Sequence, residues 1–139
     1  MMDTDQAEFF ETKTKEAVQG KPWLAALREK LLTIDGSGVV LWNGSNGEQF
    51  VAHLLDRGHV YSIENLGFRR GDLNRCHDNA QRWAERRSSQ YTYATGYALA
   101  KQIWRPHSWL IDFNKKQVIE TTVRMEVYFG FDYPVEKKQ

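Results

Sequence analysis

Residues 91–99 read YTYATGYAL, and at this stretch the sequence pattern changes from helical to β. Bulky side chains at alternate positions are typical of a strand with two distinct faces. Alternation resumes from Ile103 to Phe113, and β-branched residues dominate from Val118 to Val123. We therefore expect an antiparallel sheet in the C-terminal half, with a further strand from about Met125 to Tyr133.

The first half of the chain has helical periodicity instead, with apolar side chains three and four positions apart. Start and stop residues divide it into separate helices, with a short buried strand over 39–42. The expected helices are one over about 5–18, one from Pro22 to before Asp35, and one capped by Ser45 or Asn46 and ended by Gly58.

A further helix is expected from Cys76 to about Arg87, after an irregular approach over 60–75. No internal repeat or linker interrupts the sequence, so we expect one domain over 1–139. The pattern as a whole predicts an α+β fold in which N-terminal helices pack on a C-terminal antiparallel sheet.

The composition restricts the class of protein. The chain has 41% hydrophobic and 27% charged residues, which is ordinary for a globular protein, and its net charge of +1 argues against a nucleic-acid partner. A single cysteine cannot form an internal disulfide. No signal peptide and no apolar run of ~20 residues is present, so we expect a cytoplasmic protein that does not enter a membrane.

Cys76 is the only cysteine and stands at the start of its predicted helix. A helix N-terminus favours the thiolate, which is the nucleophilic form of the side chain. A histidine within hydrogen-bond reach stabilises the thiolate and later protonates a leaving group, and a carboxylate orients that histidine. We expect Cys76, His107 and Glu120 to form this catalytic set, in that order.

The alternation of side chains along a strand indicates which carboxylate can reach His107. His107 and Trp109 point to one face of their strand, whereas Asp112 points to the other. If Asn114-Lys115 forms a two-residue hairpin turn, Glu120 lies opposite Trp109 on the face of His107, within reach of a Glu side chain.

Acyl chemistry also needs donors aimed at the oxygen that becomes negative. The backbone N–H of Cys76 is one candidate. Asn74 and Asn79 are alternatives for the second donor, and we expect Trp109 to line the same substrate-binding region.

The run Cys76…Gly96-Tyr97…His107-Ser108-Trp109…Glu120-Thr121-Thr122 resembles the transglutaminase-like branch of the papain-like cysteine superfamily. That branch has a helix-borne Cys, a Gly-Tyr type strand, a His-Ala-Trp type strand and an Asp-Pro-Thr type strand. Peptide N-glycanases and arylamine N-acetyltransferases share the order. The resemblance covers about 73–123, with Ser108 in place of Ala and Glu120 in place of Asp. It implies a papain-like or transglutaminase-like core with a nucleophile, a base and an orienting acid at the three positions already selected.

These features predict a cysteine-dependent acyl-transfer or amide-hydrolysing enzyme, such as an amidase, deamidase, peptidase or transglutaminase-like enzyme, acting on a peptide or a small amide or acyl substrate. The alternative is a non-catalytic binding module on the same scaffold, with the aromatic-rich C-terminal half as its contact surface. No cofactor is implied, and the paired ligand spacings of structural zinc are missing around Cys76.

Six arginines surround the predicted Cys76 helix. They form either a solvated face or a site that recognises an acidic or carboxylate-bearing substrate. They are Arg69, Arg70, Arg75, Arg82, Arg86 and Arg87.

Overall fold

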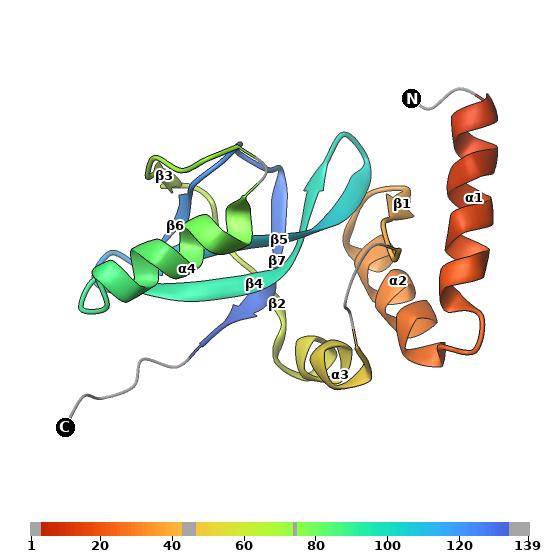
Figure 1. The fold of residues 1–139 in the computed structure, drawn as a ribbon, viewed down its shortest axis with the longest axis horizontal. Helices are drawn as coiled ribbons and strands as arrows, with labels where there is room; N and C mark the ends of the chain where they lie inside the picture. Colours follow the sequence, from red (N-terminus) through yellow and green to blue (C-terminus); the bar gives the residue numbers. More distant parts are fainter. Residues whose placement is uncertain (1–3, 43–46, 74, 134–139) are drawn as a thin grey trace.

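The computed structural model describes residues 4–42, 47–73 and 75–133. Within these ranges the chain forms four helices and a mixed sheet of seven strands, which confirms the expected α+β class (Figure 1). The helices are α1 (Thr4–Val18), α2 (Pro22–Ile34), α3 (Glu48–Arg57) and α4 (Cys76–Arg86). The strands are β1 (Gly38–Val39), β2 (His59–Val60), β3 (Gly67–Phe68), β4 (Tyr91–Ala100), β5 (Ile103–Asp112), β6 (Gln117–Glu120) and β7 (Val127–Asp132).

The helices begin and end close to the predicted residues. Pro22 opens α2, whose apolar stripe is buried, and Asp35 closes it. Gly58 ends α3 as expected, and Gly47 stands at its N-cap. The predicted caps Ser45 and Asn46 lie outside the described residues.

The order of the main path of the sheet is β2-β7-β4-β5-β6-β3, and β1 pairs with β5. The prediction of a purely antiparallel sheet is wrong, because β1 pairs with β5 and β3 pairs with β6 in parallel. These parallel strands are two residues long, too short to show any periodicity in the sequence. The last strand also returns to pair with β4 instead of continuing beside β6.

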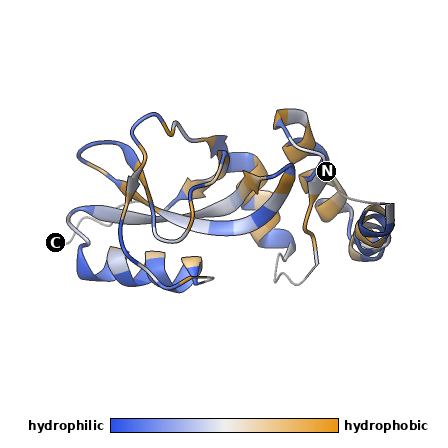
Figure 2. Ribbon diagram, turned by 90° about the horizontal axis from the view of Figure 1, so that it is seen from above, coloured by the Kyte–Doolittle hydropathy of each residue, from blue (hydrophilic) through white to orange (hydrophobic). Residues whose placement is uncertain are grey.

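The two faces of the sheet are covered differently. One face carries Tyr97, Leu99 and Trp104, which form a core with α2 and α3, and α4 packs on the same face further along. The opposite face packs against the irregular segment 61–66. Figure 2 shows α4 on one side of the long strands and irregular segments on the other.

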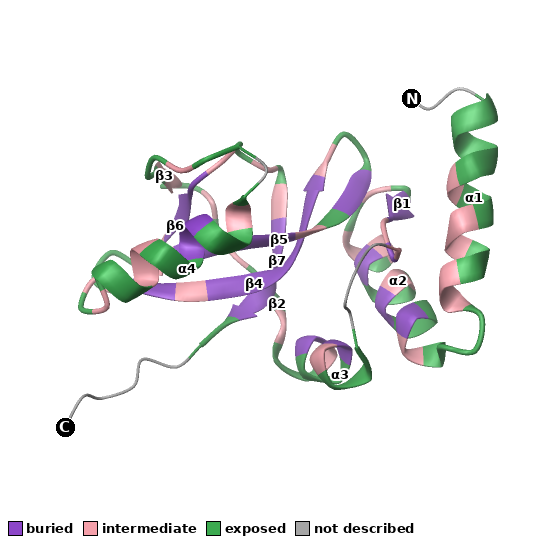
Figure 3. Cartoon of the chain, in the orientation of Figure 1, coloured by how far each residue is buried: buried purple, intermediate pink, exposed green. Residues whose placement is uncertain are grey.

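Burial follows this arrangement. Figure 3 shows buried residues running along β4, β5 and β7, whereas α1 is covered with exposed and half-buried residues. α1 has no buried residue, and Phe10 joins it to the rest of the chain through an edge contact with Trp42, with ring centroids 4.9 Å apart. No helix in the described ranges is long and apolar enough to cross a bilayer.

Gly96 allows the close pairing at the centre of the sheet. It pairs with His107 on one side and with Gly130 on the other. A Cβ atom at Gly96 would lie 2.2 Å from the carbonyl oxygen of Phe129 and 2.6 Å from the Cα of Gly130. Because both atoms belong to the backbone, neither can move without disturbing the ladder between β4 and β7.

We therefore expect Gly96→Ala to lower the free energy of unfolding by about 3 kcal/mol or more, as in strongly overpacked cores. Gly47→Ala is the matched control, since a Cβ there meets nothing within 4 Å, and its cost should stay below about 1 kcal/mol. Urea unfolding of both variants makes the comparison. Equal losses in the two variants would contradict the role given to Gly96.

Candidate active site

One edge of β5 is open along its middle, and the candidate site lies there. β4 pairs with the whole length of β5 on the other edge. On the open edge, β1 pairs with residues 103–104 and β6 pairs with residues 110–112. The N-terminus of α4 approaches the stretch between them, so that Cys76 meets His107 and the backbone of Ser108.

Cys76 is half-buried, and its surroundings lower the pKa of its thiol. Burial raises the pKa of the thiol, but a hydrogen bond and the charge of His107 lower it, as does a hydrogen bond from the backbone of Ser108. These effects outweigh burial, and the pKa lies below its ordinary value.

His107 links the thiol to Glu120. Its Nε2 donates to Glu120 Oε1 at 2.8 Å, which leaves Nδ1 as the ring nitrogen for Cys76. The imidazole is 4% exposed and the carboxylate 0%. Burial lowers the pKa of His107, but the hydrogen bonds to Cys76 and Glu120 raise it to about 9. The charged imidazolium is therefore stabilised inside the protein.

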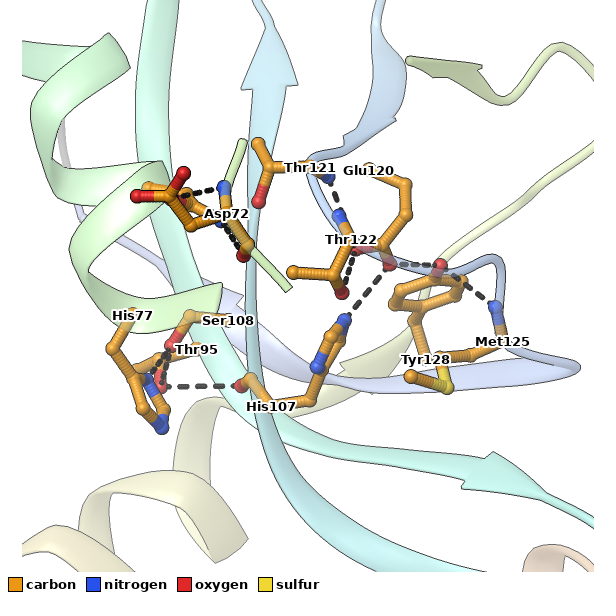
Figure 4. Close-up of polar contacts among 11 residues, drawn as sticks. Asp72, His77, Thr95, His107, Ser108, Glu120, Thr121, Thr122, Met125 and Tyr128 are labelled. Atoms are coloured by element: carbon orange, nitrogen blue, oxygen red, sulfur yellow. Dashed lines mark hydrogen bonds and ion pairs between the residues drawn. The ribbon is translucent and has the colours of Figure 1, made fainter. Parts of the chain in front are cut away.

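Glu120 is held by several donors besides His107 (Figure 4). The backbone N–H groups of Thr121 and Thr122 donate to Oε2 at 3.0 and 2.9 Å, and the Thr122 hydroxyl donates to the same oxygen at 2.9 Å. The Tyr128 hydroxyl donates to Oε1 at 2.6 Å. Burial raises the pKa of Glu120, but His107, Tyr128 and Thr122 lower it below the ordinary value.

The register that brings Glu120 to His107 is the predicted one. β5 and β6 pair Leu110 with Ile119, so the next residues along, Trp109 and Glu120, lie opposite each other. The connection is a four-residue turn over 113–116, and its centre is Asn114-Lys115. Asp112 lies on the other face, where its Oδ1 accepts from the backbone of that turn.

Trp109 lies beside the imidazole in the interior. It is fully buried, and its ring is stacked on that of His107 with centroids 6.0 Å apart and planes 23° apart. Tyr128 and Tyr61 contact it edge-on, at centroid distances of 5.0 and 5.5 Å. The structure thus places Trp109 behind the His107 ring, where it fixes the ring plane, and not in the wall of the cleft.

Hydrogen bonds with the backbone of Asp72 hold the Asn79 side chain away from the cleft. Its Oδ1 accepts from the backbone N–H of Asp72 at 3.1 Å, and its Nδ2 donates to the carbonyl of Asp72 at 2.7 Å. It therefore fastens the chain before α4 to the helix. Asn74, the other predicted oxyanion donor, lies outside the described residues.

His77 contacts the other face of β5. Its Nδ1 hydrogen-bonds with the Ser108 hydroxyl, which also lies 2.8 Å from the Tyr93 hydroxyl and donates to Thr95 Oγ1 at 2.9 Å. Burial and the charge of His107 lower the pKa of His77. This polar group holds the first turn of α4 on the sheet.

A cleft of about 310 Å³ opens at Cys76 and His107. Its walls come from the approach to α4, from β4 and β5, and from the chain after β6. Besides Cys76 and His107, it is lined by Leu73, Ala98, Ala100, Ile103, Arg105, Pro106, Thr122, Val123 and Met125.

The arginines around α4 do not line this cleft. Arg70, Arg82 and Arg86 line a separate hollow of about 200 Å³ on the side of α4 that carries Trp83. Arg82 Nη2 forms an ion pair with Asp72 Oδ2 at 3.6 Å. No group of three or more His, Cys, Asp or Glu side chains suited to a metal ion occurs among the described residues.

Sequence reasoning did not find the role of Tyr128 or the place of Arg105. Tyr128 reaches Glu120 because β4 presents small side chains, Ala94, Gly96 and Ala98, on the face between β7 and β5. That run of small residues at alternate positions is visible in the sequence and could have indicated a large side chain crossing over β4.

Comparisons with known proteins add no relative: no family model matches the chain, and neither a curated protein nor a solved structure matches it. The transglutaminase-like resemblance stays a prediction that rests on the quoted motifs.

The pKa of Cys76 can be measured directly, since the chain has one cysteine. We expect thiolate absorbance to appear at a pH below the ~8.5 of a free thiol. His107→Ala should move the titration to higher pH, because the hydrogen bond and the charge that lower the pKa are gone. His53→Ala, which removes an exposed histidine on α3, should leave it unchanged. A titration insensitive to His107 would exclude the contact.

Tyr128→Phe should lower the free energy of unfolding by about 1.5–3 kcal/mol at neutral pH, because a buried carboxylate loses a donor. The pKa of Glu120 is lowered by folding, so its contribution is present above its unfolded pKa and is lost as the pH falls through the folded one. The loss in the variant should therefore shrink in acid. Tyr61→Phe, whose hydroxyl donates to exposed Asp132, is the control and should cost about 1 kcal/mol or less.

Proposed function

We propose that the chain is a cysteine-dependent enzyme that hydrolyses or exchanges an amide or related acyl bond, on a papain-like or transglutaminase-like core. The observation that carries the proposal is the continuous path from the Cys76 thiol through His107 to Glu120. The three side chains come from α4, β5 and β6. The Cys76 end of this path lies in a cleft, where a small ligand can reach the thiol.

Cys76 supplies the nucleophile. Its thiolate attacks the carbonyl carbon, a C–S bond forms, and the carbonyl π electrons move to the oxygen. The His107 imidazolium then gives its Nδ1 proton to the amide nitrogen as the C–N bond breaks. The amine leaves, and the acyl group remains on Cys76 as a thioester.

Water or an amine resolves the thioester. Neutral His107 accepts a proton from the incoming nucleophile, which attacks the thioester carbonyl, and the thiolate leaves as the C–S bond breaks. Hydrolysis releases a carboxylic acid, whereas attack by an amine gives acyl transfer. Both routes restore the thiolate and imidazolium forms.

Glu120 acts through His107 and stays ionised throughout. Its bond to Nε2 fixes the tautomer and directs Nδ1 toward the sulfur. The donors on its remaining lone pairs keep it from taking the imidazole proton, since they stabilise the carboxylate form.

The oxygen that becomes negative needs donors near the sulfur. The first N–H groups of a helix have no acceptor within the helix, and the dipole adds partial positive charge there. The backbone N–H of Cys76 is therefore our first candidate for the oxyanion donor.

The binding-module alternative needs an exposed aromatic surface in the C-terminal half. Most of the aromatic residues in the C-terminal half are buried, and Tyr133 is the large exposed exception among those described. The buried set is Trp104, Trp109, Tyr128, Phe129 and Phe131.

With p-nitrophenyl acetate as an activated acyl donor, we expect a burst of p-nitrophenolate that matches the amount of chain. Mass spectrometry should find the acetyl group on Cys76. Cys76→Ala should abolish the burst, and His107→Ala should slow acylation by about 100-fold or more, as for loss of a positioned acid–base group. His53→Ala should react like the wild type. A Cys76→Ala protein that folds and reacts normally would refute the proposal.

A further inference from the structure

Two large aliphatic side chains stand exposed at the cleft. Leu73 is 71% exposed and Val123 is 57% exposed, and both line the cleft that contains Cys76. They come from the approach to α4 and from the chain after β6. Ile103 and Met125 continue the apolar lining. An apolar cleft of about 310 Å³ is at the small end of ligand sites and suits one residue-sized apolar group with a short acyl chain.

Arg105 introduces a positive charge into this apolar lining. It precedes His107 by two positions on β5, so both side chains stand on the same face, with Cα atoms about 6.5–7 Å apart. The Arg105 side chain is exposed and forms no hydrogen bond or ion pair with any described residue. The described lining of the cleft contains no carboxylate that could neutralise it.

The charges of Cys76, His107 and Glu120 determine how an anionic ligand is received in the cleft, and Arg105 changes their sum. With Cys76 as thiolate, His107 as imidazolium and Glu120 as carboxylate, the three groups sum to one negative charge. An anionic ligand approaching Cys76 would meet net repulsion from them. The Arg105 guanidinium opposes that repulsion, and its planar donors can bind a carboxylate through two hydrogen bonds.

Building on the proposed function, we infer that the cleft accepts an acylated apolar amino-acid residue with a free carboxylate, which Arg105 binds about one residue from the reacting carbonyl. Cys76 then forms the C–S bond to the acyl carbon, and the C–N bond to the amino-acid residue breaks. The imidazolium proton of His107 goes to the departing amine. The leaving group is a free amino acid whose carboxylate stays paired with Arg105 until release.

Two covalent probes test this inference without a known substrate. Bromoacetyl-leucine carries the carboxylate, whereas bromoacetyl-leucinamide differs by having an uncharged amide. Both alkylate Cys76 with loss of bromide, and reaction with N-acetylcysteinamide corrects for their intrinsic reactivity. We expect the wild type to prefer the carboxylate probe by about threefold or more, the scale of an accessible charge-assisted pair. Arg105→Gln should lose this preference, so that the corrected rates with the two probes become equal.

Arg124→Gln is the matched control, because Arg124 is exposed, lies between two cleft residues in sequence and is not part of the cleft lining. It removes the same charge and should retain the preference. An equal loss in both variants would mean that general charge attracts the probe, and no loss in Arg105→Gln would mean that Arg105 does not bind the carboxylate. Either result overturns the inference.

The two proposals fail separately. The preference for the carboxylate probe is a ratio, and it can be measured at alkaline pH even if Cys76 proves to be an ordinary thiol. An unactivated thiol with an Arg105-dependent ratio would reject the enzyme and keep the carboxylate site. Protection of Cys76 from iodoacetamide by acetyl-leucine and by a short peptide ending in leucine distinguishes an acyl amino acid from a peptide C-terminus. Protection by neither, in a wild type that labels normally, would overturn the inference.

Discussion

The site depends on one buried negative charge, the carboxylate of Glu120. An unpaired carboxylate in the interior costs several kcal/mol and would take up a proton instead. Here each oxygen has more than one donor: Oε1 meets His107 and Tyr128, and Oε2 meets the backbone and hydroxyl groups that follow Glu120 in the chain. The charged carboxylate raises the pKa of His107. The His107 imidazolium in turn lowers the pKa of Cys76, and this outweighs the direct effect of the Glu120 charge, which raises it. Glu120 therefore affects the thiol through His107, and the hydrogen bonds that satisfy the carboxylate keep that imidazole favourable in its charged form.

The need to supply hydrogen-bond donors to the Glu120 carboxylate explains features of the sheet that packing alone does not. Tyr128 must cross β4 to reach Glu120, so the positions beneath it are Gly96 and Ala98, and Gly130 pairs closely with Gly96. The β5 edge must also stay open between β1 and β6, or α4 could not bring its first residue to His107. This edge of β5 is therefore paired at both ends and left unpaired in the middle, where Cys76 meets His107.

Local signals in the sequence predicted the long elements and the contact between His107 and Glu120. The helical stripe and Pro22 located α2, and strand parity together with a turn centred on Asn114-Lys115 placed Glu120 on the His107 face. The return of β7 to β4 was not predictable in this way, since pairing between distant strands leaves no local periodicity. Arg105 was missed for a related reason: an arginine on a strand looks solvent-facing until the walls around it are known.

Ser108 shows how the positions of sulfur and imidazole are tied together. Its backbone hydrogen-bonds with Cys76 at the open edge, while its hydroxyl hydrogen-bonds with His77, Tyr93 and Thr95 on the opposite face from His107. One residue of β5 therefore holds both the Cys76 sulfur and the first turn of α4, and the next residue toward the N-terminus is His107. A shift of α4 along the sheet would therefore disturb both the His77 contact and the contacts of Cys76. Cys76 and His107 are consequently positioned by hydrogen bonds on both faces of β5, as the proposed transfer of a proton between them would require.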